Sequence, residues 1–353
     1  MEAKTNGLSS HLQDHLRWHK ARIKFLDLLI ISLIRNRSVN FCKNATSLSN
    51  RAPGSNLRRI QRFFAGFAFD FDAIARLLMS LMPFQGPYQL SLDRTNWKFA
   101  GVNFNILCLA VVADGVALPV LWSMLGKQGN SDQQERRKLI ARYIDLFGVH
   151  TIDYIMADRE FVGEKWFKFL ILHPLRFYIR IRANMTVSHR GRAVKAFWLF
   201  NDLPLNMARQ LEKPVMVKGN WVYLTGMRVI NRKGQTEFVI VATYQADSQT
   251  MQVYARRWAI ECFFKAIKSA GFHIEDTHLT DHKRLEKLFA VVAIAFLWVY
   301  LVGQYQNERK PIRVLAHKRR AQSVFRYGFD SLFTAILFDY QSLEIFVNLL
   351  SCT

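Results

Sequence analysis

The chain has 353 residues, of which 50% are hydrophobic and 22% are charged, and these values exclude a largely disordered protein. Its 49 Lys and Arg residues against 27 Asp and Glu residues give a net charge of +22, so the expected partner is a polyanion such as nucleic acid. A membrane surface is the competing partner, and a soluble cationic protein without such a partner is the third interpretation. The four widely spaced cysteines indicate a reducing compartment.

Residues 1–85 are predicted to form a helical domain. The segment RWHKARIKFLDLLIISLIRN has the pattern of a long amphipathic helix, and SNLRRIQRFFAGF that of a shorter helix with Ser55 as its N-cap. The shorter helix carries three cations on a common side: Arg58, Arg59 and Arg62. Two short helices around a polar turn, the second of them basic, favour a helix-turn-helix-like DNA reader. A small helical bundle with a solvated cationic face is the alternative.

Residues 86–182 are predicted to form a mixed α/β sheet. The runs YQLSLD, VNFNILCLAVVAD and VALPVLWSML are expected to be strands; RTNWKFA separates the first two, and a hairpin turn at Asp114 joins the last two. A helix with a capping box at Ser131 and Gln134 follows, then the strand IDYIMAD, a helix around GEKWFKFLILH and the strand RFYIRIR. Hairpin strands followed by alternating helices and strands are typical of a mixed sheet with crossover connections.

Residues 183–250 interrupt this alternation. The runs VMVKGNWVYLTGMRVI and EFVIVATY predict a separate small antiparallel sheet. In the helical residues 251–310, the run LFAVVAIAFLWVYLVG has a borderline length for a membrane span and is interpreted as a buried core helix. Residues 311–353 are also expected to be helical.

The segment YARRWAIECFFKAIKSAG, residues 254–271, is predicted to be one helix. At about 100° per residue, five polar side chains share one face of this helix, and apolar side chains cover the opposite face. The five are Tyr254, Arg257, Glu261, Lys265 and Lys268. An exposed ladder of ion pairs four residues apart would explain Glu261 on structural grounds alone, at about 0.3–0.5 kcal/mol per pair.

Two further carboxylates give Glu261 a second interpretation. Asp93 and Asp158 are each expected to end an apolar strand, and sites form at strand ends in α/β sheets. Three converging carboxylates repel one another unless a cation lies between them, and oxygen ligands without Cys or His favour Mg²⁺ or Mn²⁺. Two such ions about 4 Å apart can activate a water or a 3′-hydroxyl for attack on a phosphodiester. Arg257 and Lys268 would then hold DNA phosphates, and Tyr254 can hydrogen-bond one; Lys265, on the same face, is a further candidate for DNA contact.

Three motifs carry a resemblance to a known family: LDRTNW at Asp93, ADREF at Asp158, and the helical set Tyr254, Arg257, Glu261 and Lys268. Their order and spacing are similar to those of the DDE transposases of bacterial insertion sequences, in the branch with a Tyr-Arg-Glu-Lys signature, over about residues 90–270. The resemblance implies a ribonuclease-H-like core that is split by a β insertion. It also implies that the three acids bind two Mg²⁺ or Mn²⁺ ions and that the other three residues contact phosphates near the transposon end.

Cut-and-paste members of this branch form a hairpinned DNA end, and a tryptophan of the insertion stacks on a flipped base. Trp221, which follows a tight turn, is the better candidate for this role and Trp198 the second; core packing is the alternative for both. The resemblance further implies a homodimer on double-stranded DNA, with contacts to terminal inverted repeats and to target DNA. The expected location is the bacterial cytoplasm, with no membrane partner.

The resemblance also gives each segment an expected role. Residues 1–85 would recognise the DNA end, 86–182 and 251–310 would form the two parts of the catalytic core, 183–250 would be the insertion, and 311–353 would take part in dimerisation. Two alternatives stay open: a metal-dependent nuclease that uses the same triad without strand transfer, and an inactive, domesticated DNA-binding protein. The presence of all three acids weighs against the inactive form.

Overall fold

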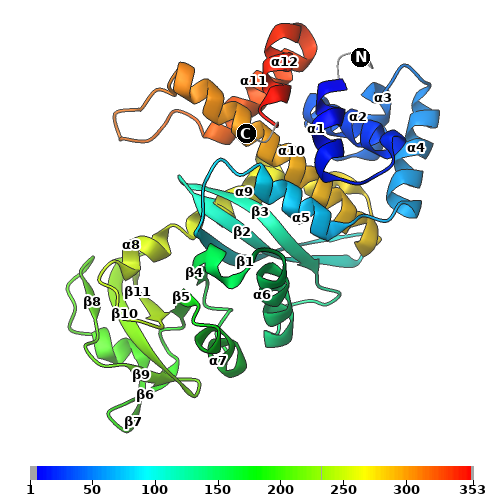
Figure 1. Ribbon diagram of the computed structural model, residues 1–353. Coiled ribbons are helices and arrows are strands. Elements are labelled where there is room, and N and C mark those ends of the chain that lie inside the picture. Colours follow the sequence, from blue (N-terminus) through cyan, green and yellow to red (C-terminus); the bar gives the residue numbers. More distant parts are fainter. Residues whose placement is uncertain (1–5, 232, 351–353) are drawn as a thin grey trace. The chain divides into compact units, whose positions relative to one another are not determined.

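The computed structural model describes residues 6–231 and 233–350, with helices at both ends of the chain and strands in its middle (Figure 1). The chain divides into two compact units. The first unit consists of residues 1–84, 97–104 and 263–353, and the second consists of residues 85–96 and 105–262. The division therefore falls within secondary-structure elements as well as between them.

Five helices form the N-terminal part of the first unit: α1 Asn6–His15, α2 Lys20–Asn36, α3 Phe41–Ser47, α4 Pro53–Gly66 and α5 Phe71–Ser80. Helix α4 begins at Pro53, not after an N-cap at Ser55. Proline is favoured in the first helical turn because it has no N–H group to leave unpaired there. The aromatic side chains between the helices pack closely; the ring centroid of Phe63 lies 4.8 Å from that of Phe25. The predicted N-terminal helical region is confirmed.

Five strands form the core sheet, and apart from residues 97–99 and 102–104 they belong to the second unit: β1 Tyr88–Phe99, β2 Val102–Ala113, β3 Val116–Met124, β4 Ile152–Ala157 and β5 Arg176–Ile181. They lie in the order β3-β2-β1-β4-β5, with β2 antiparallel to β3 and β4 parallel to both β1 and β5. The helices α6 Gln133–Phe147 and α7 Glu164–Leu172 make the two crossover connections, from β3 to β4 and from β4 to β5. This order and these directions form the predicted ribonuclease-H-like mixed sheet.

The capping box of α6 lies one residue later than the sequence suggested. Asp132 and Glu135 form it, rather than Ser131 and Gln134. The Ser131 hydroxyl instead accepts a hydrogen bond of 2.8 Å from Nε of Arg136, which is buried. Because a carboxylate at the N-cap also interacts favourably with the helix dipole, Asp132 is the better cap of the two neighbours.

Six strands within residues 183–250 form the β insertion: β6 Thr186–His189, β7 Arg192–Lys195, β8 Ala208–Gln210, β9 Val215–Val217, β10 Asn220–Ile230 and β11 Thr236–Thr243. The predicted antiparallel insertion is confirmed, but the prediction that its sheet is separate is wrong. Strand β11 pairs antiparallel with β5, and β10, β9, β6 and β7 continue the same sheet. This pairing satisfies the backbone groups that would otherwise be exposed along the edge of β5.

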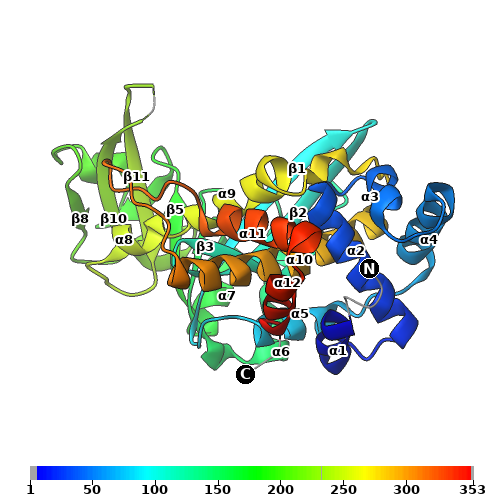
Figure 2. The ribbon, with the colours of Figure 1, turned by 90° about the horizontal axis from the view of Figure 1, so that it is seen from above.

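The remaining helices are α8 Thr250–Ala255, α9 Trp258–Lys265, α10 His282–Arg309, α11 Val324–Phe338 and α12 Tyr340–Asn348. Helix α10 is long and apolar enough to cross a membrane by length and composition, yet 83% of its most apolar window is buried inside the protein. The prediction of a buried core helix is therefore confirmed. Helices α10 and α11 lie against each other (Figure 2). At their crossing, Gly303 of α10 meets Gly328 of α11. Residues 311–323 are not helical, so the helix predicted for the C-terminal segment begins only at Val324.

Candidate active site

The first two acids stand side by side on neighbouring strands of the second unit. The parallel register of β1 and β4 aligns Leu92 with Ala157, so the next residues, Asp93 and Asp158, occupy equivalent positions. Asp158 directly follows the end of β4, as predicted. Asp93 does not end its strand, because β1 continues through RTNWKF to Phe99. The expected loop at RTNWKF is therefore part of the strand.

The signature segment is not one continuous helix. Helix α8 ends at Ala255 and α9 begins at Trp258, and a tight turn at Arg256 and Arg257 joins them. In this turn the N–H groups of Arg256 and Arg257 donate to carbonyls three residues back, each at 3.1 Å, instead of four residues back. The rotation of about 100° per residue assumed for one helix therefore fails at this turn. A single turn of π-helix, Ala266–Ala270, follows α9.

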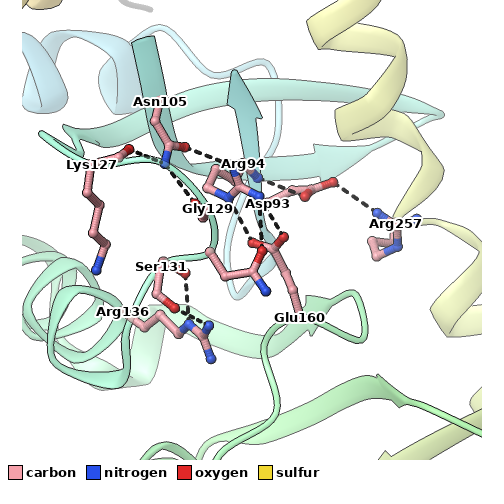
Figure 3. Close-up of polar contacts among 10 residues, drawn as sticks. Asp93, Arg94, Asn105, Lys127, Gly129, Ser131, Arg136, Glu160 and Arg257 are labelled. Carbon is pink, nitrogen blue, oxygen red and sulfur yellow. Dashed lines mark hydrogen bonds and ion pairs between the residues drawn. The ribbon is translucent and has the colours of Figure 1, made fainter. Parts of the chain in front are cut away.

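Arg257 lies between two of the acids. Its Nη1 atom donates to Oδ2 of Asp93 at 3.0 Å, and its Nη2 atom donates to Oε1 of Glu261 (Figure 3 shows the bond to Asp93). The Arg257 side chain is only 10% exposed. Tyr254, one turn earlier, donates from its hydroxyl to Oδ1 of Asp158 at 3.2 Å. The guanidinium of Arg257 also lies 5.7 Å from the ring centroid of Tyr254, so these contacts link all three predicted acids.

Burial controls the proton affinities in this cluster. It raises the pKa of Asp93 to about 6, although the guanidinium of Arg257 and the backbone N–H of Arg94 act in the opposite direction. Burial also raises the pKa of Tyr254 to about 12, so its hydroxyl is a neutral hydrogen-bond donor near pH 7. For Arg257, burial opposes the charge, yet the neighbouring Tyr254 and Asp93 raise the pKa above its ordinary value. Arg257 therefore stays positively charged among the acids.

A second ion pair holds the two acid motifs together. Arg94, next to Asp93, makes a two-pronged contact with Glu160: Nε to Oε1 at 3.1 Å and Nη2 to Oε2 at 3.0 Å (Figure 3). The two side chains are only 12% and 19% exposed. Arg94 also donates to the side-chain oxygen of Asn105, on β2, at 3.0 Å. Because Glu160 follows Asp158 by two residues, this pair fixes the loop after β4 against β1.

Sequence reasoning missed the residues of this second pair and their partner on β2. Asn105 is buried, and its side-chain amide donates to the backbone carbonyls of Lys127 at 3.1 Å and Gly129 at 2.9 Å. These bonds connect β2 to the loop that precedes α6. The signals were an amide side chain within the mostly apolar run VNFNILCLAVVAD, and the opposite charges of Arg94 and Glu160, which closely follow the two aspartates in LDR and ADRE. Polar residues inside an apolar strand require partners, so such residues indicate a buried network.

The three predicted acids have the donor chemistry of a divalent cation site. Asp93, Asp158 and Glu261 offer only carboxylate oxygens, the ligands preferred by Mg²⁺ and Mn²⁺. In the part of the chain that the structure describes, no three His, Cys, Asp or Glu side chains form a group that could hold a metal ion. Arg257 supplies the positive charge instead, through its bonds to Asp93 and Glu261. The three acids fit a divalent cation if Arg257 releases Asp93 and Glu261 when the cation binds.

Two other candidates for phosphate contact belong to the first unit. Lys265 is exposed at the end of α9. Lys268 pairs with Glu275 at 2.8 Å, and its ammonium group lies 5.5 Å from the ring centroid of Trp97. The structure therefore gives Lys268 contacts within the protein, and phosphate contact by either lysine stays a prediction.

The cations of α4 differ in their surroundings. Arg58 and Arg62 are exposed. Arg59 is half-buried: it donates to Oγ of Ser49 at 3.3 Å, and its guanidinium lies 5.2 Å from the ring centroid of Phe25. Arg59 thus helps to hold the helical domain together, whereas Arg58 and Arg62 present their charges to solvent.

Both tryptophans of the insertion are at the surface. Trp221 on β10 is 58% exposed, and Trp198, in a 3₁₀ turn, is 66% exposed. Core packing, the alternative for these two side chains, is therefore wrong. Trp221 follows the two-residue turn Lys218-Gly219, where both residues have positive φ, as a tight hairpin turn requires. Stacking on a DNA base stays a prediction for either side chain.

Comparisons with known proteins agree with this arrangement. The sequence model of the family described as "Transposase DDE domain" matches residues 85–298, which is more than half of the chain and includes all three acids. A comparison with curated proteins finds no significant match. Among solved structures, the chain is similar to the piggyBac transposase in its cryo-EM synaptic complex with hairpin DNA, with a TM-score of 0.52 and 11% identity over 93% of this chain and 73% of that one. At this identity the likeness shows the fold alone. The extent of the family match shows that this chain belongs to the Transposase DDE domain family.

Proposed function

We propose that the chain is the DNA transposase of a bacterial insertion sequence, in the branch with the Tyr-Arg-Glu-Lys signature. It would bind the terminal inverted repeats of its element and carry out metal-dependent DNA cleavage and strand transfer by a cut-and-paste route. The observation that carries this proposal is the linkage of Asp93, Asp158 and Glu261 through Arg257 and Tyr254. Three distant acids around one buried guanidinium are costly to assemble for stability alone.

The acids would hold the metal that this family uses. Asp93, Asp158 and Glu261 are the proposed ligands of two Mg²⁺ or Mn²⁺ ions. When bound, such ions lower the pKa of a water or a 3′-hydroxyl and stabilise the charge on the leaving oxygen. Arg257 is proposed to keep the carboxylates neutralised beforehand and then to move to a DNA phosphate. Its planar guanidinium suits both partners, because carboxylates and phosphates accept the same paired hydrogen bonds.

The chemistry consists of phosphodiester exchanges. In the first, water attacks the phosphorus at the transposon end, a P–O bond forms as the bond to the 3′-oxygen breaks, and a free 3′-hydroxyl results. In the second, this hydroxyl attacks a phosphorus of the opposite strand, and a P–O bond closes the hairpin as the bond to the 3′-oxygen of the flanking DNA breaks. A second water then attacks the hairpin phosphorus and frees the 3′-hydroxyl again. This hydroxyl finally attacks a phosphorus of target DNA, where the bond to a target 3′-oxygen breaks. Tyr254 would hydrogen-bond a phosphate with its neutral hydroxyl, and Lys265 and Lys268 would contact phosphates further along the strand.

The DNA contacts and the remaining roles are proposed from the surfaces that could make them. The similar piggyBac structure contains hairpin DNA, and the exposed Trp221, or else Trp198, is suited to stack on a base flipped out of such an end. Arg58 and Arg62 on α4 are proposed to contact the inverted repeat, with residues 1–85 as the end-recognition domain. Joining two ends requires two active sites, so the working form would be a homodimer on DNA in the bacterial cytoplasm.

A cleavage and joining assay tests this function. Labelled DNA from the flanks of the coding region, which holds the repeats, is incubated with the protein, Mg²⁺ and a second DNA. Glu261→Ala is expected to abolish cleavage while DNA binding persists, and Glu212→Gln, at an exposed position, is the matched control that retains activity. Full cleavage by Glu261→Ala refutes the proposed site. Cleavage without joining to the second DNA identifies a nuclease instead.

A further inference from the structure

A concentration of positive charge lies outside the proposed site. Between Glu308 and Asp330 the sequence contains no Asp or Glu and seven cations: Arg309, Lys310, Arg313, Lys318, Arg319, Arg320 and Arg326. Six of them lie in residues 309–323, which run from the last residue of α10 to the N-cap of α11 and are called the cationic arm here. Figure 1 draws this segment as an extended loop between the two helices. The DNA contacts proposed for the acids, the insertion and α4 do not involve the arm.

The arm is a short two-stranded ribbon. The N–H of Ala321 donates to the carbonyl of Arg313, and that of Leu315 to the carbonyl of Arg319, each at 2.8 Å. Val314 and Arg320 form an antiparallel bridge between these bonds. All four cations of the ribbon, Arg313 and residues 318–320, are exposed. The backbone pairing thus holds them together on a narrow projection.

The base of the arm is fixed to the first unit. Ile312 is buried, and its N–H donates to the side-chain oxygen of Asn307 at 3.0 Å. The guanidinium of Arg309 stacks on the ring of Tyr305, at 4.3 Å from the centroid, and Tyr327 donates to the carbonyl of Lys310 at 3.3 Å. A ribbon anchored in this way loses less conformational entropy on binding than a flexible tail does.

The charges of the arm are not compensated within the protein. In residues 6–231 and 233–350, none of the six arm cations makes an ion pair with an Asp or Glu side chain, whereas Arg326, just beyond the arm, pairs with Asp330 at 2.8 Å. Holding like charges together costs free energy that a polyanion would recover by releasing its counterions. A two-stranded ribbon also has the width that the major groove of B-DNA admits.

We propose that the cationic arm is a second DNA-binding element, which enters or straddles a groove of duplex DNA and contacts its phosphates. This inference rests on the proposed function, because it names a further surface for the same DNA partner. Since the contacts proposed for the arm's cations are to phosphates, their contribution is independent of base sequence. It increases the affinity for duplex DNA and the salt dependence of binding.

The test is the salt dependence of binding to a random-sequence DNA duplex by the full-length protein. The variant Lys318→Gln/Arg319→Gln/Arg320→Gln is expected to reduce the log–log slope by about 0.9 for each phosphate that the arm no longer neutralises, and so by up to about 2.7. Arg319→Lys/Arg320→Lys, which preserves charge, should retain the wild-type slope. The matched control removes three exposed lysines from α6 and α7, for which no DNA contact is proposed: Lys138→Gln/Lys165→Gln/Lys168→Gln.

An arm variant with the wild-type slope overturns the inference, and so does an equal reduction in the variant of α6 and α7, because the reduction would then report net charge alone. If the arm variant binds DNA as the wild type does but no longer binds phosphatidylglycerol vesicles that the wild type binds, the arm is a membrane-binding element. This result would also overturn the inference. Wild-type protein that fails to bind any duplex refutes the proposed function itself. Circular dichroism of each variant checks that the fold is retained.

Discussion

Neutralising Glu160 is expected to destabilise the second unit. It should also disturb the arrangement of the three acids, although none of the three is itself substituted. In Glu160→Gln the shape of the side chain is kept, but the buried guanidinium of Arg94 loses its charged partner. Removing one member of a buried ion pair outright costs about 3–5 kcal/mol. Glutamine retains one acceptor oxygen, and Asn105 and Asn130 still accept from Arg94, so a decrease of about 1–3 kcal/mol in the free energy of unfolding is expected.

The structure offers a matched control for this substitution. Asp202 also makes a two-pronged contact with an arginine, Arg209, at 2.6 and 2.7 Å, but the two side chains are 67% and 39% exposed. Exposed pairs contribute at most about 1 kcal/mol, so Asp202→Asn should cost less than Glu160→Gln. Urea denaturation followed by circular dichroism gives both free energies of unfolding. Equal decreases, or a decrease below about 0.5 kcal/mol for Glu160→Gln, would show that burial does not strengthen the Arg94–Glu160 pair.

The same pair has a functional readout. Because Arg94 and Glu160 lie close to Asp93 and Asp158 in sequence, breaking the pair should lower the rate of DNA cleavage while DNA affinity is unchanged. A double-mutant cycle with Arg94→Met would isolate their coupling, which is expected at about 0.5–3 kcal/mol for residues in contact. A coupling near zero would mean that the two residues act independently of each other.

Two further predictions concern the first unit. Burial raises the pKa of Asp27 to about 8 from its ordinary 3.8, so the native state holds a proton that the unfolded state releases, and stability should fall as pH rises from about 4 to about 8. Asp27→Asn should remove this pH dependence from the free energy of unfolding measured by denaturation; an unchanged dependence contradicts the assignment. In Gly328→Ala the new methyl group would overlap the carbonyl oxygen of Val299, at an expected cost of about 1–3 kcal/mol. The control is Gly54→Ala in α4, where no atom lies within 4 Å of the added carbon, and it should be neutral or stabilising by up to about 1 kcal/mol. Similar denaturation midpoints for the two variants would disprove the close crossing of α10 and α11.

Features set by neighbouring residues could be predicted from the sequence. The hairpin turn between β2 and β3 is Asp114-Gly115, with φ values of 51° and 77°, because few other residue pairs tolerate two successive positive φ angles. The strands and helices of the core alternate as the apolar pattern indicated. Asp158 stands at the end of β4, since an apolar run with a polar end marks a buried strand.

Features set by distant partners could not be predicted in this way. The strand β1 continues past Asp93 because Arg94 finds Glu160 and Asn105, which lie far away in sequence. Most of the cationic arm was expected to be helical, as part of residues 311–353. Pro311 disfavours a helix at the preceding residue, and adjacent like charges at residues 318–320 favour an extended ribbon, where neighbouring side chains point to opposite sides.

The two interpretations of Glu261 prove to be compatible. The ion pair with Arg257, four residues earlier, exists as the structural interpretation requires. In an exposed ladder, however, the guanidinium would be solvated, whereas here it is 10% exposed and also binds Asp93. Removing Glu261 would therefore leave a buried guanidinium hydrogen-bonded to one carboxylate, that of Asp93, so the cost exceeds the few tenths of a kcal/mol expected for a surface pair. The spacing that suggested a surface ladder is the same spacing that lets one arginine join the third acid to the first.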